Sequence, residues 1–97
     1  MPPFGRLAAI IVTGANPQAA ENAARALGRT APRAEGVEVL GPAPAPLAVL
    51  RGRYRYRLLL KAGKAVNIQR ILSRWLGSIR WPASVRVRVD VDPYSFL

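Results

Sequence analysis

Strict alternation of side chains in two stretches constrains the fold of this chain more than any other feature. In residues 85–91, VRVRVDV, valine occupies every odd position and a charged residue every even position. In residues 53–61, RYRYRLLLK, arginine alternates with tyrosine before the stretch becomes apolar. Because successive side chains of a β-strand point to opposite faces of a sheet, both stretches are predicted to be strands with one charged face.

The other segments predict one buried strand and two helices. Residues 7–13 form an apolar, partly β-branched run that ends at Gly14, which is typical of a buried strand. Asn16 can cap a following helix and Pro17 suits its first position. A second helix is predicted over residues 66–79, where apolar residues recur every three or four positions. The inward residues of the first helix are expected to be Ala20, Ala23, Ala24 and Leu27.

Three closely spaced prolines, at positions 42, 44 and 46, precede the arginine-rich strand. Residues 37–40 are predicted to form a short strand that runs into GPAPAPLAV. Since proline has no backbone N–H, this stretch must lie at a sheet edge or form an extended loop. Two interpretations stay open: an edge strand protected against pairing with other chains, or a docking surface for a neighbouring domain.

The resulting order of elements, β-α-β-β-α-β, predicts an α+β fold of the split βαβ, ferredoxin-like type. Such a fold has a four-stranded, mostly antiparallel sheet with both helices on one face. The 97 residues suit one domain, so we expect residues 1–97 to fold as a unit. In the usual strand order 4-1-3-2, the valine face of residues 85–91 and the tyrosine–leucine face of residues 53–61 meet the helices.

The charge of the chain indicates what the uncovered face binds. Fifteen Lys and Arg residues stand against five Asp and Glu, giving a net charge of +10, which favours a polyanionic partner such as nucleic acid. Clustered like charges destabilise a sheet, whereas arginine offers a bidentate fork to phosphate oxygens. We therefore predict a surface that holds the DNA backbone. The candidate residues are Arg51, Arg53, Arg55, Arg57, Lys61, Lys64, Arg86 and Arg88, with Trp81 as a candidate for stacking on a base.

The sequence lacks the residues that several classes of function require. The chain has no cysteine and no histidine, so the usual zinc ligands and the usual general base are missing, and no metal site is expected. It has no G-x-x-x-x-G-K-[ST] phosphate loop and no nucleophile–base pair, so we do not expect this chain alone to be an enzyme. No apolar run approaches the roughly 18 residues of a membrane span, and no membrane partner is expected. Asp90 and Asp92 are expected to pair with neighbouring arginines or to cap the chain end.

Three stretches carry a family resemblance. PPFGRLAAIIVTG, EVLGPAPAPLAVLRGRYRYRLLLKA and VRVRVDVDP, in this order, resemble the C-terminal domain of the replication-restart helicase family PriA, primosomal protein N′. The resemblance implies a ribosomal-protein-like domain that helps to bind forked or branched DNA during primosome assembly, in the bacterial cytoplasm at the nucleoid. Full-length members are ATP-driven 3′-to-5′ helicases with a cysteine-rich zinc insertion. The ATP and zinc sites belong to parts that this chain does not match, so no cofactor is expected here.

The resemblance also implies protein partners. The family docks the acidic tail of the single-stranded-DNA-binding protein partly through residues at the start of the second helix of this domain. Lys64 and Gln69 fall at that place, while Ala65 occupies the nearest match to a basic residue of the family. Two alternatives to DNA binding stay open: a module that packs on the helicase lobes of the parent protein, and a ribosomal-type domain that binds RNA.

Overall fold

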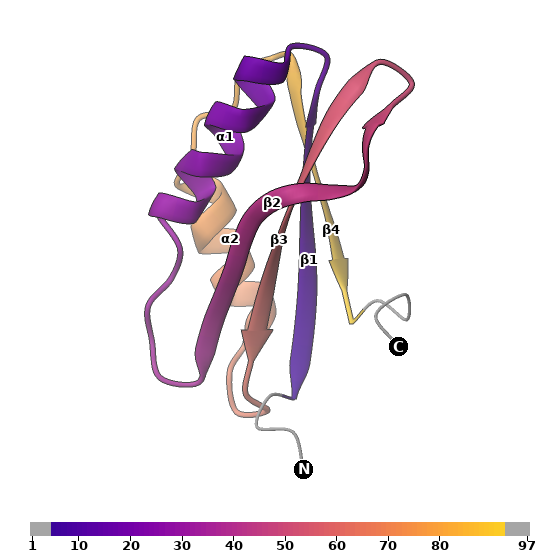
Figure 1. The fold of residues 1–97 in the computed structure, drawn as a ribbon. Coiled ribbons are helices and arrows are strands. Elements are labelled where there is room, and N and C mark those ends of the chain that lie inside the picture. The colour runs from indigo at the N-terminus through magenta and orange to yellow at the C-terminus, as the bar shows by residue number, and fades with distance from the viewer. Residues whose placement is uncertain (1–4, 93–97) are drawn as a thin grey trace.

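The computed structural model describes residues 5–92 and contains the six elements that the sequence predicts. All three strand pairings are antiparallel, and the strand order is β2-β3-β1-β4, so the split βαβ prediction is confirmed (Figure 1). The Pro-Pro-Phe lead and Pro93, which contribute to the family resemblance, lie outside the described residues. The elements are β1 (Arg6–Gly14), α1 (Pro17–Arg29), β2 (Val37–Leu50), β3 (Arg53–Ala62), α2 (Ile68–Gly77) and β4 (Val85–Val91).

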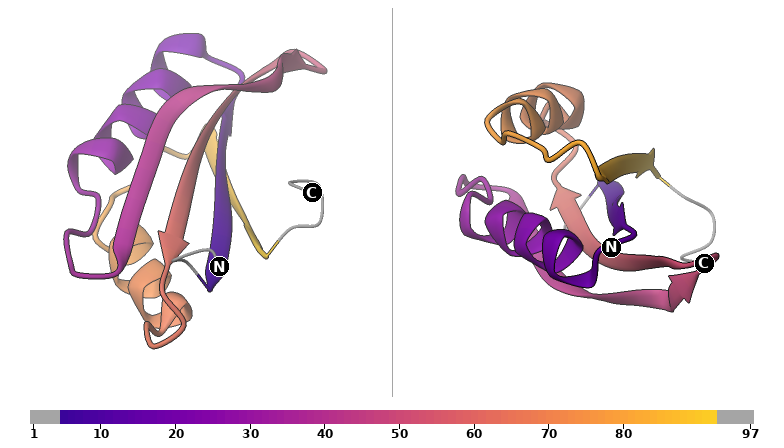
Figure 2. Two further views of the ribbon diagram at one scale, coloured as in Figure 1. Left: turned by 60° about the horizontal axis from the view of Figure 1, so that its bottom comes forward. Right: turned by 90° about the horizontal axis from the view of Figure 1, so that it is seen from above.

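Both helices cover the same face of the sheet, and no helix of residues 5–92 lies on the opposite face (Figure 2). The core fills the space between the two layers. From the sheet, alternate residues of the central strands enter it: Ala8, Ile10, Val12, Leu58 and Leu60 are fully buried. From the helices, Leu27, Ile68, Leu72 and Trp75 complete it. The predicted inward face of α1 is also confirmed, since Ala20, Ala23, Ala24 and Leu27 are all buried.

Asparagine caps fix where both helices begin. The Asn16 side chain accepts hydrogen bonds from the backbone N–H groups of Gln18 and Ala19, at 2.9 and 3.1 Å. The Asn67 side chain accepts one from the N–H of Arg70 at 3.0 Å, so α2 begins at Ile68. The predicted range of residues 66–79 was therefore too long at both ends. The apolar period continues beyond the helix because flanking residues also pack on the core, and periodicity alone does not mark a cap.

The proline-rich segment is an edge strand. β2 runs for 14 residues along β3, with register shifts between Leu40 and Ala43 and between Pro44 and Val49. The predicted edge position is confirmed, and the strand predicted over residues 37–40 extends to Leu50. At the first shift, Gly41 has a φ of +102°, and a Cβ there would lie 2.7 Å from the carbonyl oxygen of Arg57. A glycine at this position thus lets an irregular strand stay close to β3.

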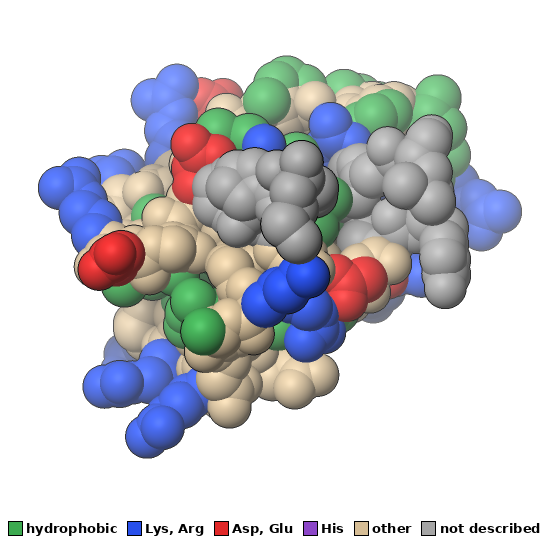
Figure 3. Space-filling model, turned by 90° about the horizontal axis from the view of Figure 1, so that it is seen from below, with side chains coloured by type: hydrophobic (Ala, Val, Ile, Leu, Met, Phe, Trp, Pro, Cys, Tyr) green, Lys and Arg blue, Asp and Glu red, His purple; other side chains and the backbone are tan. Residues whose placement is uncertain are grey.

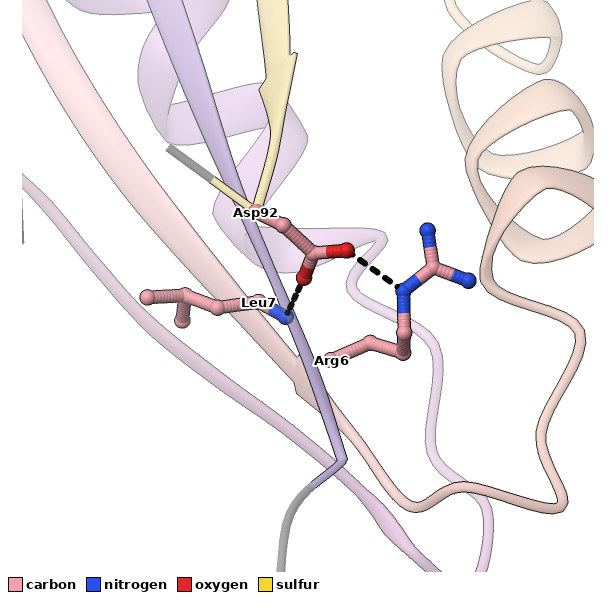
Figure 4. A network of polar contacts seen from close by, with 3 residues as sticks. All are labelled: Arg6, Leu7 and Asp92. Carbon is pink, nitrogen blue, oxygen red and sulfur yellow. Dashed lines mark hydrogen bonds and ion pairs between the residues drawn. The ribbon is translucent and has the colours of Figure 1, made fainter. Parts of the chain in front are cut away.

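Asp92 joins the end of β4 to the start of β1. Its carboxylate accepts a hydrogen bond from the backbone N–H of Leu7 at 2.9 Å and one from Arg6 Nε at 2.7 Å (Figure 4). These contacts lower the pKa of Asp92 below its ordinary value of 3.8; the Leu7 hydrogen bond contributes most, followed by that of Arg6. The predicted pairing of Asp92 with an arginine is confirmed, with Arg6 as the partner.

Candidate nucleic-acid interface

The uncovered face of the sheet carries arginines on both sides of the central strand. Arg57 on β3 and Arg88 on β4 both pair with Ile11 of β1. Two residues further along β1, on the same face, Arg55 and Arg86 both pair with Thr13. Since neighbouring strands lie about 4.8 Å apart, each pair of arginines begins from backbone positions roughly 10 Å apart. The predicted juxtaposition of Arg55, Arg57, Arg86 and Arg88 on one surface is therefore what the strand pairing produces.

The guanidinium groups of the two β4 arginines, Arg86 and Arg88, are exposed and have no partner among the described residues. Neither guanidinium makes a hydrogen bond or an ion pair with a residue of the range 5–92. A guanidinium carries five N–H donors and stays charged at any physiological pH. The donors of Arg86 and Arg88 are therefore available to an incoming anion.

Two arginines of β3 make hydrogen bonds within the domain. Arg53 Nη2 donates to the carbonyl oxygen of Thr13 at 3.2 Å and also reaches the Thr13 hydroxyl. Arg55 Nη1 donates to the carbonyl oxygens of Pro46 at 2.9 Å and of Leu47 at 3.3 Å. These bonds hold neighbouring backbone in place, and each guanidinium keeps further N–H groups. Arg53 and Arg55 thus have a structural role, and their binding of phosphate stays a prediction.

Arg51 does not belong to the arginine row of β3. It lies with Gly52 in the two-residue turn between β2 and β3, and both have positive φ, +52° and +76°. Such a turn matches the twist of a hairpin, so Leu50 pairs directly with Arg53. Arg51, a predicted member of the binding surface, therefore lies outside the strand, with its exposed side chain at the hairpin tip.

The remaining candidates lie around this surface. Lys61 is on the same face of β3 as the arginines, with its Nζ 3.9 Å from a carboxylate oxygen of Glu38 on β2. Lys64 is exposed in the turn before α2. Trp81 is half-buried and packs against the core on the helix side, away from the arginines. Stacking of Trp81 on a base stays a prediction, and its position favours packing.

A hollow of about 390 Å³ lies on the arginine-bearing face, and the sequence alone gave no sign of it. It forms because the β2–β3 hairpin extends away from the helices and past the sheet (Figure 2). We call it the hairpin hollow. Its lining includes Ile11, Thr13, Leu50, Arg55, Arg86 and Arg88. Asp90 lines it as well, and no ion pair joins its carboxylate to another of the described residues. Leu50 was missed as a site residue because its proximity to β4 depends on the course of the hairpin.

Lys64 and Gln69, the predicted partner-binding residues, lie at the entrance of α2. Lys64 precedes the Asn67 cap and Gln69 occupies the first turn of the helix. Both side chains are exposed, as are those of Ala65 and Arg70. The place is therefore open to a protein partner and distinct from the arginine surface, because α2 covers the opposite face of the sheet.

Positive charge is not confined to the sheet. Seen from the end of the molecule where β1 begins, lysine and arginine side chains appear on several sides of the outline (Figure 3). Some basic residues of the chain have acidic neighbours; on α1, Arg25 Nη2 lies 2.8 Å from Glu21 Oε1. The distinguishing property of the sheet face is therefore the pairing of arginines across β1.

Within residues 5–92, no group of three or more acidic, cysteine or histidine side chains lies close enough to hold a metal ion. No helix in this range is long and apolar enough to cross a membrane.

Comparison with known proteins gives matches to one family across nearly the whole chain. The family model described as primosomal protein N C-terminal domain matches residues 1–94. The replication restart protein PriA of Rickettsia felis is 43% identical over 96 residues, and that of Treponema pallidum is 37% identical over 98. The probable replication restart protein PriA of Deinococcus radiodurans is 44% identical over 96 residues. These matches cover 99%, 99% and 97% of the chain but only 15%, 15% and 10% of the respective relatives.

Proposed function

This chain belongs to the family of the primosomal protein N C-terminal domain, and we propose that it is a DNA-binding module that holds the backbone of forked or branched DNA during replication restart. The name replication restart protein PriA, borne by the relatives, and the primosomal name of the family support this proposal. The chain spans about 15% of the length of the first relatives. Unwinding, ATP use and zinc binding would therefore belong to other parts of such proteins, in the cytoplasm of a bacterium.

The observation that carries this proposal is the pair of arginines opposite each of two successive open-face residues of β1. Arg86 and Arg88 lack partners within the described chain, so a phosphate that binds there displaces no internal contact. A surface of this kind holds phosphates without reading base sequence. It offers positive charge, but no helix or strand of the described residues that would enter a DNA groove and contact the base edges. If about five phosphates are neutralised, log K should fall against log salt with a slope of roughly −4 to −5 on duplex DNA.

The first experiment measures fluorescence anisotropy of labelled forked DNA, plain duplex, single strand and structured RNA at several salt concentrations. The proposal expects salt-sensitive binding with preference for DNA that carries a junction. Preference for structured RNA would instead support the ribosomal-type alternative. Absence of binding to every ligand near physiological salt would overturn the nucleic-acid function.

Charge reversal tests the surface itself. Arg86→Glu with Arg88→Glu should weaken binding by one to two orders of magnitude, because two phosphate contacts become repulsive. The matched control is Arg70→Glu with Arg74→Glu, which makes the same charge change on two exposed residues of α2. An equal loss in both double variants would show that net charge, and no particular surface, governs binding.

A second candidate function is protein docking, favoured by exposed apolar side chains along β2. Leu40 is 42% exposed, Leu47 70% and Val49 54%. A row of exposed aliphatic residues on an edge strand suits contact with another domain, here the helicase lobes of a longer parent protein. Tight association of the purified domain with such lobes, lost in Leu47→Asp with Val49→Asp, would support it.

Docking of the single-stranded-DNA-binding protein tail is a separate proposal at the α2 entrance. An acidic tail would meet Lys64 and Gln69, whose side chains are both exposed. Lys64→Glu should abolish such binding, measured by calorimetry with a tail peptide. Unaltered peptide affinity in this variant would remove the α2 entrance from consideration.

A further inference from the structure

The hairpin hollow combines an apolar surface with unpartnered arginines, which a purely backbone-holding surface does not need. Ile11 forms part of its lining from the middle of the sheet, and Leu50 lines it from the hairpin. Leu50 is 44% exposed although it is a large aliphatic residue. The guanidinium groups of Arg86 and Arg88 flank this apolar surface from β4.

We propose that the hairpin hollow accepts one unpaired nucleotide, with its base against Ile11 and Leu50 and its phosphate on Arg86. This inference rests on the proposed DNA-binding function and specifies its ligand as single-stranded DNA. A base that is paired and stacked in a duplex cannot reach an apolar wall, whereas an unpaired base offers a flat apolar face and removes Leu50 from water. The volume of about 390 Å³ lies within the range of small-molecule sites.

The position of Asp90 fixes the orientation of the nucleotide. Asp90 follows Arg88 on the same face of β4 and lines the same hollow. Its carboxylate repels phosphate, so the phosphate is expected at the Arg86 end. The base then occupies the stretch between Ile11 and the hairpin, where Leu50 and the aliphatic part of Arg55 form the wall.

A pair of hairpin variants tests the inference. Leu50→Ala removes the apolar wall without any change of charge, and Leu47→Ala is the matched control, since Leu47 lies on the same hairpin and does not line the hollow. Three labelled ligands of equal length are compared at one salt concentration: an oligothymidylate, an oligomer of abasic sites and a duplex. Urea unfolding of each variant establishes that both are folded.

The inference expects wild-type protein to bind the oligothymidylate about 5-fold or more tightly than the abasic oligomer, and Leu50→Ala to erase that difference. Leu47→Ala should retain it, and duplex affinity should be equal in all three proteins. Equal wild-type affinity for thymidylate and abasic ligands, beside strong duplex binding, would overturn the nucleotide site and leave the proposed function standing. No wild-type binding to any of the three ligands would overturn the proposed function, and this inference with it. The abasic comparison needs no variant, so it decides the question even if Leu50→Ala does not fold.

Discussion

The guanidinium of Arg55 donates a hydrogen bond of 2.9 Å to the carbonyl oxygen of Pro46, nine residues earlier in the chain. This bond joins the β3 strand to the irregular part of β2, where the ladder between the two strands shifts register. Arg55 therefore supports the hairpin whose Leu50 side chain lines the hollow on the arginine-bearing face. In the sequence, Arg55 is one of several alternating arginines. In the structure, it also supports the hairpin that forms one side of the hollow.

Replacement of Arg55 by alanine should destabilise the hairpin. Two backbone carbonyls lose a charged donor, and the free energy of unfolding should fall by about 1 kcal/mol, since the bonds are exposed to water. Urea unfolding measures the change. Arg51→Ala is the control, because it removes the same charge from the exposed hairpin turn, where no hydrogen bond of the described chain involves the side chain. Equal stability of the two variants would contradict a structural role for Arg55.

The Asp92 contacts predict a pH dependence of stability. Because the folded state lowers the pKa of Asp92 below 3.8, its ionised form stabilises the fold. That contribution is fully present above the unfolded pKa and is lost as pH falls through the lower folded pKa. Asp92→Asn should therefore be less stable than wild type at neutral pH, and the two should converge at pH values below 3.8. Asparagine tolerates the positive φ of +51° at this position, so the comparison isolates the charge.

Urea unfolding of wild type and Asp92→Asn at a series of pH values checks this expectation. Asp90→Asn is the control, since Asp90 makes no ion pair within residues 5–92. A stability difference between wild type and Asp92→Asn that stays constant into strong acid would refute the electrostatic explanation.

Trp75 connects the two helices, and its replacement by phenylalanine should be costly. The indole Nε1–H of Trp75 donates to the carbonyl oxygen of Leu27 at 3.1 Å in the buried core. Trp75→Phe removes this donor and leaves a gap, so the free energy of unfolding should fall by roughly 2–3 kcal/mol. Trp81→Phe should cost less, because Trp81 is half-buried and makes no such hydrogen bond within the described chain. A reversed order in urea unfolding would contradict the assignment of Trp75 as the core tryptophan.

Removal of the Asp90 charge should strengthen DNA binding. Its carboxylate lines the same hollow as Arg86 and Arg88 and reduces the local positive potential. Asp90→Asn should raise affinity for DNA several-fold at low salt, with a smaller gain at high salt because of screening. Anisotropy titration of Glu35→Gln supplies the control, since the same charge is lost from an exposed turn between α1 and β2. A similar gain in both variants would indicate an effect of net charge alone.

Local features of the sequence predicted the elements and the faces of the strands. The alternation in residues 85–91 gave the exact bounds of β4, and Asn16 with Pro17 gave the start of α1. The reason is that side-chain direction along a strand and the capping of a helix depend on residues close together in the chain. The end points of α2 were less exact, because apolar residues just outside the helix also pack on the core.

What the sequence by itself determined about this protein is therefore the order of its elements, the covered and uncovered faces of its sheet, and the charge of the open face. Tertiary structure alone decided which arginines the fold employs, that Arg51 leaves the row at a hairpin turn, and that Leu50 comes to line the hollow with Arg86. The hydrogen bond between Arg6 and Asp92 likewise joins residues that are 86 positions apart in the sequence. Each of these depends on how distant segments approach one another, and a bulged edge strand leaves no periodic trace of its path in the sequence.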